Sequence, residues 1–184
     1  MIALVHFPEM TGEDINVNMM PFIYGDKDSL PEFLQPWWMT VRSCGFKDYK
    51  DKIVYLTVQE SFVKEGETQR RGGIHVEAPY TGAAWGGGGN GKGLFMASSD
   101  GRTRVWDGVI KPGMCSMGGA VGVGMLKGMK SYDLDPYQLI WMTDHTPHKA
   151  LPALESGRRQ FFRLVSNDVS IWYSQHNTAN PLGI

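Results

Sequence analysis

The chain has 184 residues, of which 42% are hydrophobic and 20% charged, and its formal net charge is -1 at neutral pH. These values fit one globular domain with one core and exclude a disordered or fibrous chain. A near-neutral charge with scattered basic residues offers no broad attraction for phosphate backbones, so we expect no nucleic-acid partner. No stretch approaches the roughly 18 apolar residues that cross a bilayer, so we expect no membrane partner.

The N-terminus and the cysteines indicate a cytoplasmic protein. The opening residues MIALVHFPEM contain a short apolar run without a basic leader or a small-residue cleavage site, which favours a first strand over a signal peptide. Cys44 and Cys115 have no spacing typical of a disulfide framework or a zinc knuckle. We therefore expect free thiols in a reducing compartment.

The next elements in chain order are an irregular connection and a helix. Residues 13–29 show no sustained periodicity, which predicts an irregular segment over one end of the domain. Residues 29–42 open with Ser29 as a cap, followed by a proline in the first turn and by Glu32, which predicts a helix. Pro36 is a point where that helix can be interrupted.

Short β-type segments fill the rest of the chain. Residues 52–62 are rich in β-branched residues and predict a strand. Similar segments recur between glycines, at 73–79, 93–98, 103–106, 138–143 and 160–173. Many short strands with 23 glycines predict a barrel or a sandwich rather than a parallel α/β sheet.

Two glycine-rich stretches resemble nucleotide-binding loops only superficially. Residues 85–93 lack the ordered Walker pattern, so we expect a lid or hairpin turn there. Residues 113–128 lack the strand-to-helix context and the downstream acid of a dinucleotide fold. Neither stretch predicts a nucleotide site.

His75 and Glu77 are the first candidate metal ligands. They lie two residues apart in a predicted strand, and alternate side chains of a strand point to the same face. If that face lines a barrel interior, an imidazole and a carboxylate become neighbours in a coordination sphere. The alternative is an exposed polar face of an edge strand.

His148 is the third candidate ligand. The strand at 138–143 ends in a turn that carries His145 and His148, and we favour His148 because a proline fixes the backbone before it. Asp107 is an alternative carboxylate, although it precedes a glycine as turn residues do. Two histidines and one carboxylate form the facial set that suits non-haem iron(II) and leaves coordination positions open.

These motifs resemble those of the cupin and iron(II) 2-oxoglutarate-dependent oxygenase superfamily. The segment Thr146-Pro-His-Lys-Ala-Leu-Pro152 resembles the second cupin metal motif, and His75-Val-Glu77 resembles part of the first. The resemblance implies a mainly β fold, the double-stranded β-helix or cupin-like jelly roll, with one or two peripheral helices. It implies one domain over residues 1–184, with a core at about 53–173. Glu77 in place of aspartate and the missing second histidine of His-x-His leave the metal and cosubstrate open.

The oxygenases carry a basic residue about ten positions after the distal histidine, where it binds the far carboxylate of 2-oxoglutarate. Arg159 matches this position, and Arg158 and Arg163 remain alternatives. A surface arginine at a strand start is the other interpretation of Arg159.

Three functional hypotheses follow. The first is a mononuclear non-haem iron oxygenase, a dioxygenase that acts on a small molecule through His75, Glu77 and His148, with Fe(II) and 2-oxoglutarate. Residues 13–29 and 80–92 would cover its site, and Gln59 is a candidate substrate contact. The second is a cupin-type metalloenzyme without 2-oxoglutarate, such as a dioxygenase, isomerase or lyase. The third is a metal-free β-barrel that binds a small ligand.

Two surface features complete the expectations. Arg70 and Arg71 are adjacent cations, which we interpret as a solvated pair. An edge strand such as the first can pair with a second copy, so we expect a homodimer.

Overall fold

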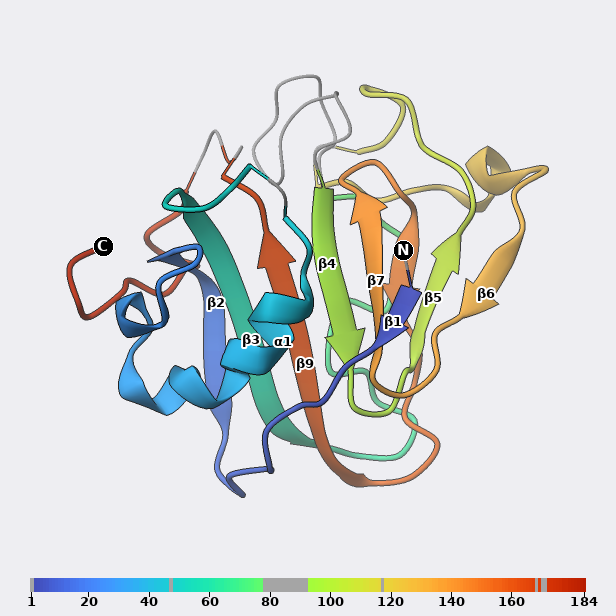
Figure 1. Cartoon of the computed structure of the whole chain (residues 1–184). Helices are drawn as coiled ribbons and strands as arrows, with labels where there is room; N and C mark the ends of the chain where they lie inside the picture. Colours follow the sequence, from blue (N-terminus) through green and yellow to red (C-terminus); the bar gives the residue numbers. More distant parts are fainter. Residues whose placement is uncertain (1, 47, 78–92, 117, 168, 170–171) are drawn as a thin grey trace.

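The computed structural model describes the chain except for residues 1, 47, 78–92, 117, 168 and 170–171. Its strands are β1 (Ile2–Leu4), β2 (Ile15–Ile23), β3 (Ile53–Val63), β4 (Gly93–Ser98), β5 (Thr103–Trp106), β6 (Ser131–Asp133), β7 (Gln138–Thr143), β8 (His148–Ala150) and β9 (Gly157–Val165). They form a six-stranded sheet in the order β1-β7-β4-β9-β3-β2 and a three-stranded sheet in the order β6-β5-β8 (Figure 1). The strand pairings are antiparallel. The expectation of a mainly β protein is confirmed.

The predicted helix is present but divided. Its residues form the 3-10 helix η2 (Glu32–Trp37) and the short α-helix α1 (Trp38–Ser43), while η1 (Lys27–Ser29) precedes them and η3 (Val123–Leu126) lies elsewhere. Pro36 lies inside η2, where its missing N–H prevents a continuous α-helix. Ser29 caps neither helix, because its hydroxyl donates to the carbonyl groups of Ile23 and Asp26.

The prediction of an irregular connection over residues 13–29 is wrong, because β2 occupies most of it and pairs with β3. The register shifts between Val17 and Met20, so that two residues lie opposite Thr57, and Met19 has a φ of 49°. The Met19 N–H bonds to the Thr57 hydroxyl. Such a β-bulge breaks the period of two that identifies a strand in a sequence.

Three of the other predicted strands are present in the structure. The segments at 93–98, 103–106 and 138–143 match β4, β5 and β7. The final strand ends at Val165 rather than at 173. In the segment predicted at 73–79, His75 forms isolated bridges, and the last two residues lie outside the described part, as does the glycine-rich loop at 85–92.

Alternation along β9 divides the interior into two cores. Phe162 and Leu164 face a cluster that joins the six-stranded sheet to the helical segment, and the Trp37 ring stacks on Phe162 at 6.0 Å. Figure 1 shows this helical segment lying across β3 and β9. Phe161 and Val165 face a second cluster that draws on both sheets. The second face of β9 therefore leads into the space between the sheets.

The cysteines and the helices bear on the expected cellular compartment. Cys44 is a buried free thiol, and Cys115 is half-buried. Across the described residues, no helix combines the length and the apolar character needed to pass through a membrane.

Candidate metal centre

His75 and His148 are brought together by the backbone. Each donates its backbone N–H to the carbonyl oxygen of the other, at 3.0 Å in both directions. The bridge is antiparallel and adds the His75 segment to the edge of the three-stranded sheet beside β8. Directly paired residues place their side chains on one face, and the two ring centroids lie 4.3 Å apart.

Glu77 completes the cluster. It lies two residues beyond His75, and its backbone N–H donates to the Asp144 carbonyl oxygen. The three residues offer one ligand atom each within 4.8 Å of one another. His75 and His148 are buried, and Glu77 is half-buried. The structure thus brings together the three residues that the sequence singled out.

Both imidazole rings are oriented by the same kind of contact. Nδ1 of His75 lies 2.7 Å from the Gly73 carbonyl oxygen, and Nδ1 of His148 lies 3.0 Å from the Thr146 carbonyl oxygen. A carbonyl oxygen only accepts hydrogen bonds, so we assign the proton to Nδ1 in both rings. The Nε2 lone pair is then free to bind a metal, which is how carbonyl groups orient histidine ligands.

The protonation of His75 also suits a ligand. Burial, and then the neighbouring His148, lower the pKa of His75 to about 4. The ring is therefore neutral at neutral pH, and no proton has to leave it before a metal binds.

Arg163 of β9 holds the Glu77 carboxylate. Its Nη1 donates to Glu77 Oε1 at 2.8 Å, while His148 Nε2 lies 3.5 Å from the same oxygen. Burial opposes ionisation, but Arg163 holds the pKa of Glu77 well below its usual range. Arg163 is itself positioned by Thr57 and by Asn18, which the bulge in β2 presents to it.

The three side chains could hold a metal ion after they approach one another. Metal–ligand bonds of about 2.0–2.2 Å place neighbouring ligand atoms roughly 3 Å apart, so atoms that lie as much as 4.8 Å apart have to close by up to roughly 2 Å. The donor set is the one that non-haem iron(II) accepts with coordination positions left open. The same set also suits other divalent transition metals.

A small cavity of about 50 Å³ adjoins the cluster. Its lining combines the three candidate ligands with cationic and apolar side chains: Arg70, Arg71, His75, Glu77, Met96, Thr103, His148, Lys149, Ala150, Phe161 and Arg163. Among these residues Glu77 is the one acid. The cavity is therefore rich in positive charge.

Other predicted site residues lie apart from this cluster. Arg159 shares the inner face of β9, but its Nη2 is 2.5 Å from Asp100 Oδ1, and it is not among the described residues that line the cavity. Arg158 points to the opposite face and pairs with Asp14. His145 lies 3.8 Å from the Asp144 carboxylate, and Asp107 accepts the backbone N–H of Lys130.

Sequence reasoning missed three residues near the site. Arg70 lines the cavity instead of being fully solvated. Asn18, in the segment 13–29 that was predicted to be irregular, accepts a hydrogen bond from Arg163. Asp144 is buried beside Glu77, and its Oδ2 has no hydrogen-bond partner among the described residues. No local sequence pattern marks Arg70 or Asp144. Gln59, predicted as a substrate contact, accepts a hydrogen bond from Arg70 instead.

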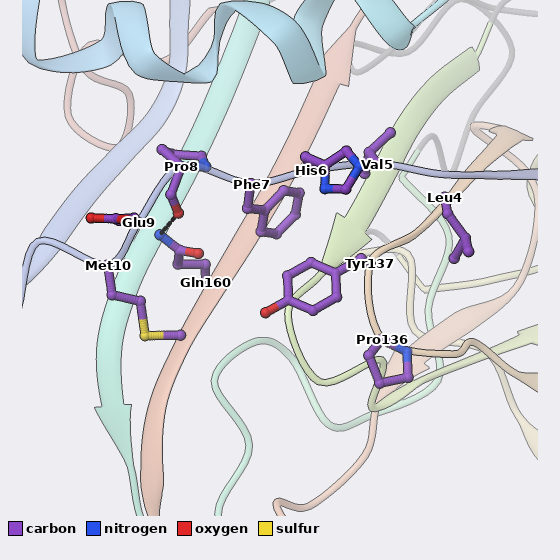
Figure 2. Close-up of a pocket in the computed structure, with 10 residues that line it drawn as sticks. All are labelled: Leu4, Val5, His6, Phe7, Pro8, Glu9, Met10, Pro136, Tyr137 and Gln160. Carbon is purple, nitrogen blue, oxygen red and sulfur yellow. Dashed lines mark hydrogen bonds between the residues drawn. The ribbon is translucent and has the colours of Figure 1, made fainter.

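A larger hollow of about 480 Å³ lies elsewhere, between the N-terminal segment and Tyr137 (Figure 2). Figure 2 shows Gln160 donating to the Pro8 carbonyl oxygen beside Phe7 and Met10. Its lining has two titratable side chains besides Tyr137, namely His6 and Glu9, and no described cluster of metal-ligating groups lies there. We therefore place the candidate site at the smaller cavity.

Comparison of this sequence with protein-family models and with curated proteins found no match. The resemblance to cupins accordingly rests on the sequence motifs quoted above.

Proposed function

We propose that this chain is a mononuclear non-haem iron oxygenase that acts on a small molecule, with Fe(II) bound by His75, Glu77 and His148. The observation that carries the proposal is the convergence of these side chains, with both histidines oriented through Nδ1. Neutral imidazoles and an ionised carboxylate are the protonation states that a divalent metal requires.

The proposal includes the double-stranded β-helix as the fold. Two antiparallel sheets share an interior cluster, and the candidate ligands lie on one sheet while Arg163 reaches them from the other. This is the arrangement expected of a metal site inside a cupin-like jelly roll.

Each residue of the proposed metal site has a defined role. The metal, when bound, would supply dioxygen activation at the coordination positions that the protein leaves open. His75 and His148 present Nε2 atoms with fixed orientation, and Arg163 keeps the Glu77 carboxylate ionised and immobile. Phe161 and Met96 form apolar walls that limit water access to the cavity.

Two observations favour a reaction without 2-oxoglutarate. Arg159 is engaged by Asp100 and does not line the cavity, so the predicted cosubstrate anchor is occupied. The cavity of about 50 Å³ is also far smaller than the roughly 300 Å³ at which pockets for larger ligands begin. A cupin-type dioxygenase acting on a compact substrate is therefore the preferred form of the proposal.

Metal analysis tests the proposal. Protein purified without chelator should contain about one iron per chain after anaerobic reconstitution, and a His75→Ala, His148→Ala double variant should contain none. A His6→Ala, His176→Ala double variant is the matched control and should retain the metal. Wild-type protein that takes up no metal would reject the enzyme hypotheses and leave the metal-free binding barrel.

Calorimetry separates the two oxygenase forms. We expect no saturable binding of 2-oxoglutarate to the anaerobic iron-loaded protein. Saturable binding that is lost in an Arg163→Met variant or in an Arg159→Met variant would support the 2-oxoglutarate-dependent form and would identify its anchor.

A further inference from the structure

We propose that Arg70 binds the carboxylate group of the substrate and that the substrate is a small organic acid. This inference deepens the proposed function, since it concerns the cavity beside the candidate metal centre.

Arg70 is held in place at the cavity by two contacts. Its guanidinium carbon lies 4.9 Å from the centre of the Phe161 ring, and its Nη1 donates to Gln59 Oε1 at 3.3 Å. Phe161 lies on β9 two residues before Arg163, so the ring that Arg70 contacts and the Arg163 side chain share one face of that strand. The stacking fixes the planar head group and leaves other N–H donors available to a ligand.

The positive charge of Arg70 has no ion-pair partner among the described residues, although Glu77 lines the same cavity. Burial and then repulsion from Arg163 lower the pKa of Arg70 to about 10, although Glu77 opposes this. Since Glu77 is already paired with Arg163, no other described carboxylate lining the cavity balances the charge of Arg70.

The chemistry and size of the cavity define the ligand class. A guanidinium matches a carboxylate through two parallel hydrogen bonds, and a metal ion would increase the local demand for negative charge. The space of about 50 Å³ is less than twice the roughly 30 Å³ that one water occupies in the liquid, so the ligand must be compact. We therefore assign the ligand to the smallest organic acids, of which acetate and malonate are representative.

Calorimetric titration with malonate, acetate and inorganic phosphate tests the inference on metal-free and Mn(II)-loaded protein. We expect malonate to bind both forms. In an Arg70→Gln variant its affinity should fall by about tenfold to a hundredfold, because one charged hydrogen-bond donor is lost. An Arg70→Lys variant, which keeps the charge, should recover part of the binding. Arg42→Gln is the control, because Arg42 is exposed and is not among the residues that line the cavity. This variant should bind malonate with the affinity of the wild type.

The outcomes separate this inference from the metal site. A variant Arg70→Gln that takes up metal normally but has lost malonate binding supports the inference. Equal malonate affinity in wild type and Arg70→Gln, or no saturable binding of either carboxylate to wild type, would overturn it. Phosphate binding tighter than malonate would overturn the assignment to carboxylates. Loss of the metal proposal would instead show as wild-type protein without metal uptake, whatever the malonate titration gives.

Discussion

Glu60 and Glu77 are two carboxylates enclosed by the same sheet system, and their surroundings differ. Glu60, on the face of β3 that packs against the helical segment, accepts hydrogen bonds from the Thr11 and Gly12 backbone, the Thr11 hydroxyl and Gln160, and Arg158 Nε lies 3.5 Å from its Oε1. Glu77 faces a cavity, with Arg163 and His148 as its nearest charged or polar partners.

The difference distinguishes a structural carboxylate from one that is available for chemistry. The oxygens of Glu60 are saturated by the N-terminal segment, which it fastens across the sheet. Glu77 retains coordination capacity next to two histidines whose Nδ1 atoms lie against backbone carbonyl oxygens. Burial of a carboxylate therefore does not by itself identify a functional site. A carboxylate with unfilled hydrogen-bonding capacity beside other metal-ligating atoms does.

The largest expected effect is on metal binding by Glu77→Gln. The amide keeps the shape of the side chain but removes the negative charge, so metal affinity should fall by about a hundredfold or more. Competition against a chromogenic chelator measures this. Glu60→Gln is the matched control, and a similar loss in both variants would contradict the distinction drawn between the two carboxylates.

Glu60→Gln should instead reduce stability. Loss of charge-assisted hydrogen bonds at a fully buried carboxylate should cost about 1.5–3 kcal/mol of unfolding free energy. Urea denaturation of the metal-free protein gives this value. A cost below about 0.5 kcal/mol would mean that the contacts to Thr11 and Gly12 do not stabilise the native state.

The smallest expected effect concerns Asp144 and pH. Burial, with a contribution from Glu77, raises the pKa of Asp144 to about 7. A raised folded-state pKa means that the folded protein binds the proton more tightly than the unfolded chain does, so Asp144 destabilises the fold increasingly as pH rises from about 4 to 7. Asp144→Asn should therefore stabilise the metal-free protein more at pH 8 than at pH 5, by roughly 1–3 kcal/mol.

Urea denaturation at the two pH values measures this difference. His75, whose pKa is lowered, changes stability in the opposite direction as pH falls from about 6.5 to 4, so the variant must be compared with wild type at each pH. A stabilisation equal at pH 5 and pH 8 would contradict the assignment of a raised pKa to Asp144.

Local sequence patterns were sufficient for strands with clear boundaries. β4 begins at Gly93, where an added side-chain carbon would lie 2.1 Å from the Met142 carbonyl oxygen, so the residue that marks the boundary is also required by the packing. The bulge at Met19 hid β2, because an inserted residue reverses the alternation after it.

The candidate metal ligands could also be predicted from local sequence patterns. The spacing of His75 and Glu77 predicts a common face for an extended segment, and Pro147 precedes His148 in the sequence. Arg159 and Arg163 share a face, so only the register of β9 with β3 and β4 shows that Arg163 lies opposite Thr57 and Met96 beside the cluster. Arg70 depends on a long-range contact with Phe161 that no local pattern encodes.

The most direct test of the metal centre is long-range ¹H–¹⁵N correlation of the histidine side chains during titration with Zn(II). We predict that His75 and His148 carry the proton on Nδ1 in the metal-free protein, and that both Nε2 resonances shift and saturate at one equivalent of zinc. His6 and His176 should not respond. Protons on Nε2 of His75 and His148, or zinc-induced shifts absent from both, would contradict the site.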